Sequence, residues 1–98
     1  MNRSKVEELA FLAAATESIQ LAFRLLQARK TTAALASIEH VIALCEEHPL
    51  YARDWNHLNT LHEIVCLCVS SADVMPRMTS RAHTLIQRID ELKGATIN

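Results

Sequence analysis

The chain has 98 residues, half of them hydrophobic, and a formal net charge of −1. This length corresponds to one domain, residues 1–98, and the apolar content excludes a mainly disordered chain. The near-neutral charge removes a general attraction to nucleic acid or to an anionic membrane, and no apolar run reaches the roughly 20 residues that span a bilayer. The single glycine and two prolines favour a few long helices over many strands joined by turns.

The first predicted helix covers about residues 4–28. Ser4 and Glu7 have the spacing of a capping box, in which the two side chains satisfy free N–H groups of the first turn. Two apolar stripes follow at helical spacing, so we expect this helix to be buried on more than one side. The main stripe is Leu9, Leu12, Ile19, Phe23 and Leu26, and the second is Phe11, Ala15, Ala22 and Leu25.

The second predicted helix covers about residues 31–47 and ends at His48-Pro49, because the residue before a proline disfavours the helical conformation. Either Thr31 or Thr32 can act as its N-cap. No glycine or proline separates it from the first helix, so a single continuous helix through residue 47 is the alternative. Its apolar stripe is Leu35, Ile38, Ile42 and Cys45, with Val41 and Leu44 beside it.

The third predicted helix covers about residues 50–71. Its run Ile64–Val69 fits a buried strand by periodicity alone, but the preceding turns are helical and no partner strand is evident, so we favour a helix. One face carries Tyr51, Trp55, Leu58, His62, Val65 and Val69, with Leu61, Ile64 and Cys68 next to it.

The fourth predicted helix covers about residues 74–93, with Asp73 as its cap and Pro76 tolerated in the first turn. Lys93 and Gly94 form a stop signal, which leaves residues 95–98 as a frayed tail. The apolar stripe is Met75, Met78, Ala82, Leu85, Ile89 and Leu92.

These four segments predict an all-α fold, an antiparallel bundle of about four helices arranged as stacked helical hairpins. The first and fourth segments have the most regular stripes. We therefore expect them to pair with each other or with a second copy of the chain, and dimerisation is a further way to complete the bundle.

Residues 18–46 resemble a tetratricopeptide helical hairpin. Leu21, Ala22 and Leu25 match its large, small and large positions in the first helix, and Ala34 and Ile38 match the small and large positions of the second. The resemblance implies two helices in close contact, as in the small helical chaperones of bacterial secretion systems, which shield apolar partner helices. The chain departs from the pattern where Ser18 replaces an aromatic residue, Val41 a small residue and Glu46 the terminal proline.

Two histidine–cysteine pairs are the candidates for metal binding. His62 and Cys66 lie four residues apart, and Cys45 and His48 lie three apart, so together they would supply four nitrogen and sulfur ligands for zinc. The alternative is that Cys45 and Cys66 are small core residues and His48 a surface residue at a helix end. The apolar neighbours of Cys66 favour burial, which also argues against a nucleophilic Cys66–His62 pair. We expect no bound metal or other cofactor.

Tyr51 and Trp55 are the large amphipathic aromatic residues of the third segment. They either pack in the core at one end of the bundle or anchor a partner, since both types are common in interface hot spots. With Leu58, Phe11, Arg77 and Arg81 they form the predicted partner-binding set.

Arg77, Arg81 and Arg88 are predicted on the outer side of the last helix, where Arg77 and Arg81 could contact phosphates. The function favoured by the sequence is nevertheless a non-enzymatic protein–protein interaction module: a chaperone, adaptor or inhibitor that shields a partner helix or self-associates. A small nucleic-acid-associated transcriptional regulator is the alternative. The three cysteines favour a cytoplasmic protein with reduced thiols, and no membrane or small-molecule partner is expected.

Overall fold

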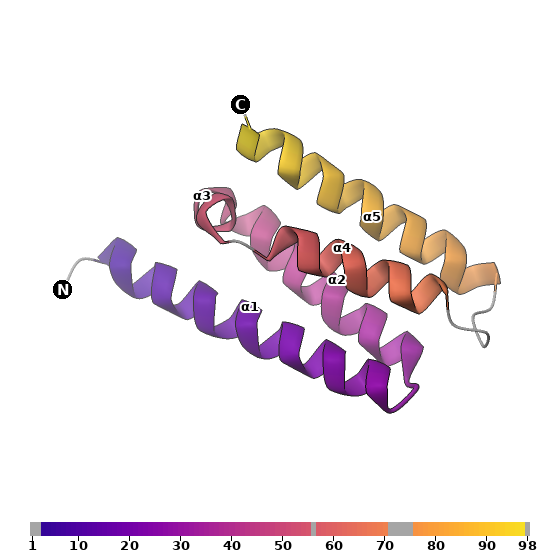
Figure 1. The fold of residues 1–98 in the computed structure, drawn as a ribbon. Helices are drawn as coiled ribbons and strands as arrows, with labels where there is room; N and C mark the ends of the chain where they lie inside the picture. The colour runs from indigo at the N-terminus through magenta and orange to yellow at the C-terminus, as the bar shows by residue number, and fades with distance from the viewer. Residues whose placement is uncertain (1–2, 56, 71–75, 98) are drawn as a thin grey trace.

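The computed structural model describes residues 3–55, 57–70 and 76–97, and side chains for residues 5–52, 55, 57–70 and 78–94. Every regular element in these ranges is a helix, so the prediction of an all-α fold is confirmed. Figure 1 shows their arrangement. In chain order the helices are α1 (Arg3–Gln27), α2 (Thr31–Glu47), α3 (Pro49–Asp54), α4 (Leu58–Val69) and α5 (Pro76–Ile97).

Helix α2 occupies the centre of the molecule and contacts each of the other four helices. It forms an antiparallel hairpin with α1, and α4 forms a second hairpin with α5 (Figure 1). The short helix α3 packs against α5 and α2 at one end. The expected pairing of the first and last segments is wrong, because α1 packs mainly on α2 while α5 packs on α4, α2 and α3.

The break between α1 and α2, which the sequence left open, occurs at residues 28–30. Arg29 has a φ of 61°, in the left-handed region. The Lys30 N–H donates to the Leu25 carbonyl at 2.8 Å and the Arg29 N–H donates to the Leu26 carbonyl at 3.0 Å. This is the Schellman arrangement that ends many helices, here built on arginine where glycine is usual.

The threonine N-cap expected for the second helix is not formed. Lys30 occupies the N-cap position and makes no side-chain capping bond, while Thr31 and Thr32 lie inside the first turn. The predicted end of this helix is confirmed, because the His48 N–H donates to the carbonyls of Leu44 and Cys45 and Pro49 then begins α3. Proline is favourable there, since the first N–H of a helix has no partner within it.

The third predicted helix is two helices. Helix α3 ends where Trp55 takes an extended conformation, with φ −95° and ψ 114°, and α4 begins at Leu58. The break lets the Trp55 side chain turn into the core, where it is 5% exposed. The apolar run Ile64–Val69 is helical, as favoured from the sequence.

Helix α5 continues to Ile97, so the predicted stop at Lys93-Gly94 is wrong. A single glycine costs a helix only about 1 kcal/mol relative to alanine, which does not end a helix by itself. Asp73 and Met75, given as cap and stripe residue, and the Ser4 side chain of the predicted capping box lie outside the described residues.

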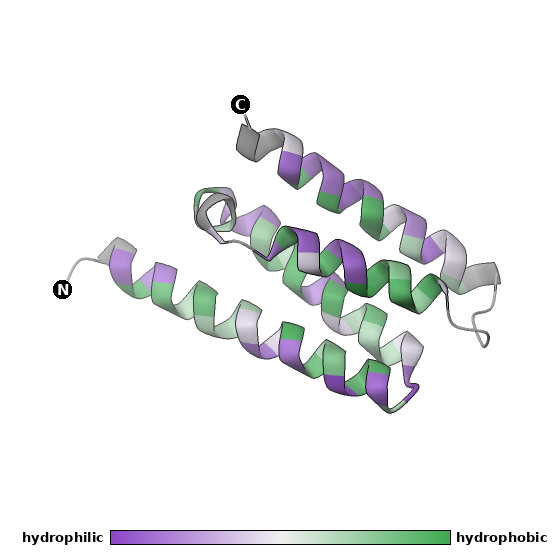
Figure 2. Ribbon diagram, in the orientation of Figure 1, coloured by the Kyte–Doolittle hydropathy of each residue, from purple (hydrophilic) through white to green (hydrophobic). Residues whose placement is uncertain are grey.

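The core forms around α2, whose apolar stripe is buried as predicted. The predicted stripe of the last helix is also buried from Ala82 to Leu92. Figure 2 shows the contrast between the outer helices, with hydrophilic residues along much of α5 and hydrophobic residues along much of α1. The bulkiest fully buried side chains are Leu35, Ile38, Ile42, Leu61, Ile64, Leu85 and Ile89.

Candidate interaction site

Helix α1 is buried along one side only. Phe11, Ala15, Ile19 and Ala22 line that side and are at most 6% exposed. Their spacings of four, four and three keep them on one face of the helix. This face corresponds to the stripe that the sequence ranked second, joined by Ile19 from the stripe ranked first.

Small residues explain why this face was chosen. Ala15 and Ala22 on α1 and Ala34 on α2 are all fully buried, and small side chains let two helices approach closely. The Ser37 hydroxyl on α2 donates to the Ser18 carbonyl on α1 at 2.7 Å, which ties the two helices together. Helices α1 and α2 are therefore packed together with small buried residues on both.

The opposite side of α1 is apolar and exposed. Val6 and Leu9 are each 50% exposed and Phe23 is 40% exposed. The predicted burial of Leu9 and Phe23 is therefore wrong: α1 contacts neighbours on one side, so a helix with two apolar sides leaves one of them uncovered. A long helix with apolar residues on more than one side is the sequence signal for this surface, but the sequence does not show which side is covered.

We call this exposed set the outer stripe of α1. Its members follow alternating spacings of three and four residues, the pattern of a helix-packing seam. Ala13, Thr16 and Gln20 are its central residues, and all three are exposed. Lys5 and Arg24 flank its two ends and Glu17 lies between them. The outer stripe is Val6, Leu9, Ala13, Thr16, Gln20 and Phe23.

By length and composition, Lys5–Gln27 of α1 is the one helix among the described residues that could cross a membrane. In the apolar 18-residue stretch of this helix, 22% of the residues are buried inside the molecule. Core helices and signal sequences share this length and composition, so these properties alone do not assign α1 to a membrane.

Three of the six residues in the predicted partner-binding set are internal. Phe11, Trp55 and Leu58 are 3%, 5% and 8% exposed. Phe11 is the centre of an aromatic cluster, with ring centroids 5.9 Å from His48, 6.0 Å from Tyr51 and 5.8 Å from Trp55. Of the two roles predicted for Trp55, packing in the core is therefore the one observed. Tyr51 is half-buried beside His48, and the centroids of their stacked rings are 5.5 Å apart.

The arginines of the last helix do not point away from the molecule as predicted. Arg81 pairs with Glu39 of α2 at 3.0 Å, and Arg88 pairs with Glu46 of α2. The side chain of Arg77 lies outside the described residues. Arg81 and Arg88 each already have a carboxylate partner, which removes the geometric support for phosphate binding by these two residues.

The four candidate zinc ligands do not form one site. The described residues contain no group of three or more histidine, cysteine, aspartate or glutamate side chains placed to hold a metal. Cys45 is buried. This burial and, to a smaller extent, the negative charge of the neighbouring Glu46 raise the pKa of the Cys45 thiol to about 12. Burial also raises the pKa of Cys68. The predicted burial of Cys66 is wrong, because Cys66 lies on the exposed face of α4 and Cys68 is the buried neighbour.

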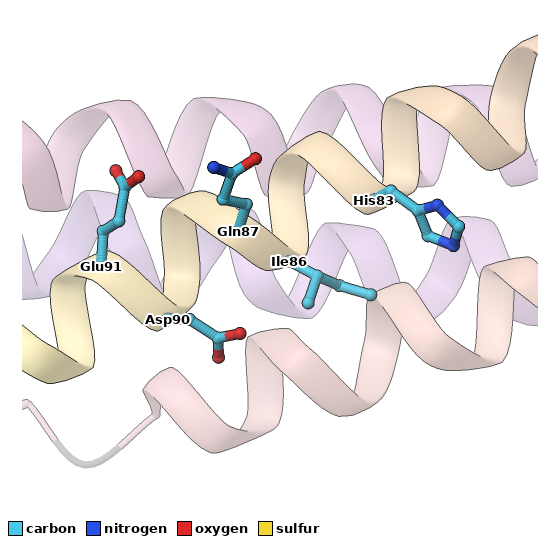
Figure 3. Close-up of a pocket in the computed structure, with 5 residues that line it drawn as sticks. All are labelled: His83, Ile86, Gln87, Asp90 and Glu91. Carbon is cyan, nitrogen blue, oxygen red and sulfur yellow. The ribbon is translucent and has the colours of Figure 1, made fainter.

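Two hollows on the surface lack converging chemical groups. Figure 3 shows the larger, of about 500 Å³, whose five lining residues all belong to α5. Gln87 and Glu91 project to one side of that helix and Asp90 to another, so the polar groups diverge. The smaller, of about 230 Å³, lies at the α2–α3 connection and is lined by Glu47, His48, Pro49, Leu50 and Tyr51.

Comparison of the chain with protein-family models, curated proteins and solved structures finds no match. The outer stripe of α1 is therefore identified from its own residues: it contains Val6, Leu9 and Phe23, three of the four large hydrophobic side chains exposed on the described part of α1, and the fourth, Leu21, is 43% exposed beside it.

Proposed function

We propose that this protein is a non-enzymatic helical interaction module of the cytoplasm, which acts as a chaperone, adaptor or inhibitor. The outer stripe of α1 is its contact surface, and the occupant is an amphipathic helix of another protein. The observation that carries the proposal is the one-sided packing of α1, with Val6, Leu9 and Phe23 at 40–50% exposure opposite its buried face.

Burial of these three side chains by a partner supplies the driving force. About half of each remains to be covered. Complete burial of a large apolar side chain is worth about 1.5–3 kcal/mol, so each half-exposed residue contributes on the order of 1 kcal/mol. The three together support moderate affinity before the cost of association is subtracted.

The shape of the outer stripe fits a crossing helix. Ala13 and Thr16 are small and lie at its middle, with Val6 and Leu9 at one end and Phe23 at the other. Small residues at a crossing point let two helices come close, and larger residues on either side fill the space as they diverge. A helix with apolar residues at spacings of three and four provides the matching surface.

Charge favours another protein over a second copy at this surface. Two antiparallel copies of α1 that align Ala13 with Thr16 bring Lys5 of one copy level with Arg24 of the other at both ends. Two parallel copies in register place each charge beside its equivalent. Like charges that face each other across an interface between two proteins are unfavourable. A partner helix with acidic residues near its ends complements Lys5 and Arg24 instead.

The experiment uses a synthetic helix-forming peptide of about 21 residues with leucines at spacings of three and four. One version carries glutamates beside the leucines near each end, and a second carries lysines there. Fluorescence anisotropy with the purified chain measures both affinities. We expect the glutamate peptide to bind more tightly, and the double variant Leu9→Gln/Phe23→Gln to weaken its binding at least about tenfold, since about 1.4 kcal/mol corresponds to a factor of ten.

Leu50→Gln is the matched control, because Leu50 is 72% exposed and lies outside α1. It should leave binding unchanged. The proposal is wrong if the double variant binds as well as the unaltered chain or if the lysine peptide binds more tightly. It is also wrong if α1 binds phospholipid vesicles, through Leu9 and Phe23, in preference to either peptide.

A further inference from the structure

Helix α4 carries a histidine and a cysteine in contact on its surface. The Nδ1 atom of His62 lies 3.7 Å from the Sγ atom of Cys66, one turn further along the helix. Cys66 is exposed and His62 is half-buried. The Ser70 hydroxyl donates to the Cys66 carbonyl at 2.9 Å and not to the sulfur, whose hydrogen-bond partner is the His62 ring nitrogen.

The separation of these two atoms suits a tetrahedral metal ion. Zinc binds imidazole nitrogen at about 2.0–2.1 Å and thiolate sulfur at about 2.3 Å, which places the two ligand atoms about 3.6 Å apart at the tetrahedral angle. The observed 3.7 Å is close to that value. His62 and Cys66 therefore need little rearrangement to hold one ion between them.

The pair supplies two of the four ligands that a structural zinc site needs. Structural zinc has four protein ligands, and the described residues offer no third histidine, cysteine or carboxylate in a suitable group. A second copy related by a two-fold axis brings the same nitrogen and the same sulfur, which completes a Cys₂His₂ set. A two-fold contact is self-complementary, so the copy contributes the missing ligands by symmetry.

The residues around the pair favour an association of two copies that forms only when the metal is bound. Leu67, next to Cys66, is 53% exposed and would be covered by the copy. Glu63 is exposed on the same helix, one turn before Cys66 and beside His62. In a two-fold pair that joins His62 and Cys66 of both copies, the two Glu63 carboxylates would repel each other without a cation, whereas a divalent ion would attract both.

We propose that His62 and Cys66 bind zinc, or another divalent ion that prefers nitrogen and sulfur ligands, between two copies of this chain. Each Cys66 thiol releases its proton to solvent on binding, so two thiolates balance the charge of the ion. This site lies on α4 and does not use the outer stripe of α1, so the proposed helix-binding function can fail while the metal site stands.

The test titrates the full chain with Co²⁺ and with Zn²⁺ under a phosphine reductant, which prevents a Cys66–Cys66 disulfide. We expect a thiolate-to-cobalt charge-transfer band that saturates at one ion per two chains. Sedimentation should show a dimer formed by zinc and reversed by a chelator. Cys66→Ser and His62→Gln should each lower metal affinity at least about tenfold, since each removes two of the four ligands in the pair of chains.

His83→Gln is the control for histidine, because His83 is exposed on α5; it should keep both the band and the dimer. Circular dichroism establishes that each variant is folded. The proposal is wrong if folded unaltered chain shows no charge-transfer band, if it binds one ion per monomer, or if the dimer forms without metal or persists in Cys66→Ser.

Discussion

The guanidinium of Arg88 on α5 binds the carboxylate of Glu46 on α2 through two nitrogens, with Nε 3.1 Å from Oε2. Two helical turns away, Arg81 makes the equivalent contact with Glu39 at 3.0 Å. Both pairs join residues 42 apart in the chain. They therefore fix the register of α5 against α2 at two points along the same interface.

The Arg88–Glu46 pair makes stability depend on pH in the acid range. The pKa of Glu46 is lowered, mainly by the hydrogen bond from Arg88 and in addition by the charge of Arg88, which together outweigh the opposite effect of burial. A carboxyl group with a lowered folded pKa contributes stability above its unfolded pKa and loses it as pH falls through the folded value. Thermal unfolding of Glu46→Gln and the unaltered chain should therefore differ near pH 7 and converge toward pH 3.

The size of this effect should be small, because the side chains of Arg88 and Glu46 are 29% and 40% exposed. A double-mutant cycle with Glu46→Gln and Arg88→Gln should give a coupling of about 0.3–1 kcal/mol that decreases with added salt. Glu47→Gln, an exposed neighbour, is the control and should give no coupling with Arg88→Gln. Equal coupling for both glutamates would contradict the assignment.

Replacement of Arg29 by glycine should stabilise the protein. Arg29 adopts a φ of 61° in the turn that ends α1, a conformation that costs a residue with a Cβ roughly 1 kcal/mol more than glycine. Relief of this conformation should raise the free energy of unfolding of Arg29→Gly by about 0.5–1 kcal/mol in urea titrations. The greater entropy that glycine gives the unfolded chain offsets part of this gain.

The control for this change is Arg24→Gly, which places glycine inside α1 and should destabilise by roughly 0.5–1 kcal/mol. If both substitutions lower stability equally, the left-handed conformation of Arg29 is not a source of strain.

Cys45 should weaken the fold in alkaline solution. Burial raises its pKa from 9.0 to about 12, so the folded state keeps the thiol proton where the unfolded state loses it. Stability should therefore fall as pH rises from about 9 toward 12. Cys45→Ala removes this term, and urea midpoints between pH 7.5 and 10.5 should decline less steeply in that variant.

Cys66→Ala is the comparison for Cys45, because Cys66 is exposed. Its urea midpoint should decline with pH as steeply as that of the unaltered chain. An equal slope for Cys45→Ala would show that the buried thiol does not contribute.

Trp55 should tolerate phenylalanine. Its indole N–H is buried and has no hydrogen-bond partner among the described residues, and an unsatisfied buried donor costs about 1–3 kcal/mol. Trp55→Phe removes this donor while it keeps an aromatic ring against Phe11, so the stability loss should stay below about 2 kcal/mol. Trp55→Ala removes the ring and should cost about 3–5 kcal/mol. Equal losses in the two variants would mean that the ring contacts are not important.

The stripes of α2 and α5 could be predicted from sequence because each of these helices has one apolar side. Ile38 and Ile42 on α2, and Leu85 and Ile89 on α5, recur at spacings of three and four and are buried. The end of α2 was predictable for a covalent reason, since Pro49 restricts the residue before it. These features depend on local geometry and on the contrast between apolar and polar faces.

Helix α1 could not be oriented in this way. Both of its sides carry apolar residues, and the sequence predicted burial on more than one side, with the stripe of Leu9 and Phe23 ranked first for its regular spacing. The tertiary structure buries the side with Ala15 and Ala22, because small residues let α1 approach α2 closely. The exposed outer stripe, on which the proposed function rests, follows from that choice.

The sequence by itself therefore determined that this protein is helical, where α2 ends and which residues of α2 and α5 form the core. The tertiary structure decided which face of α1 is free, that Trp55 interrupts the third segment, and that Arg81 and Arg88 pair with α2. The physical reason is that helical periodicity is a property of neighbouring residues, whereas the choice between two apolar faces and the partner of a charged side chain depend on residues far away in the chain.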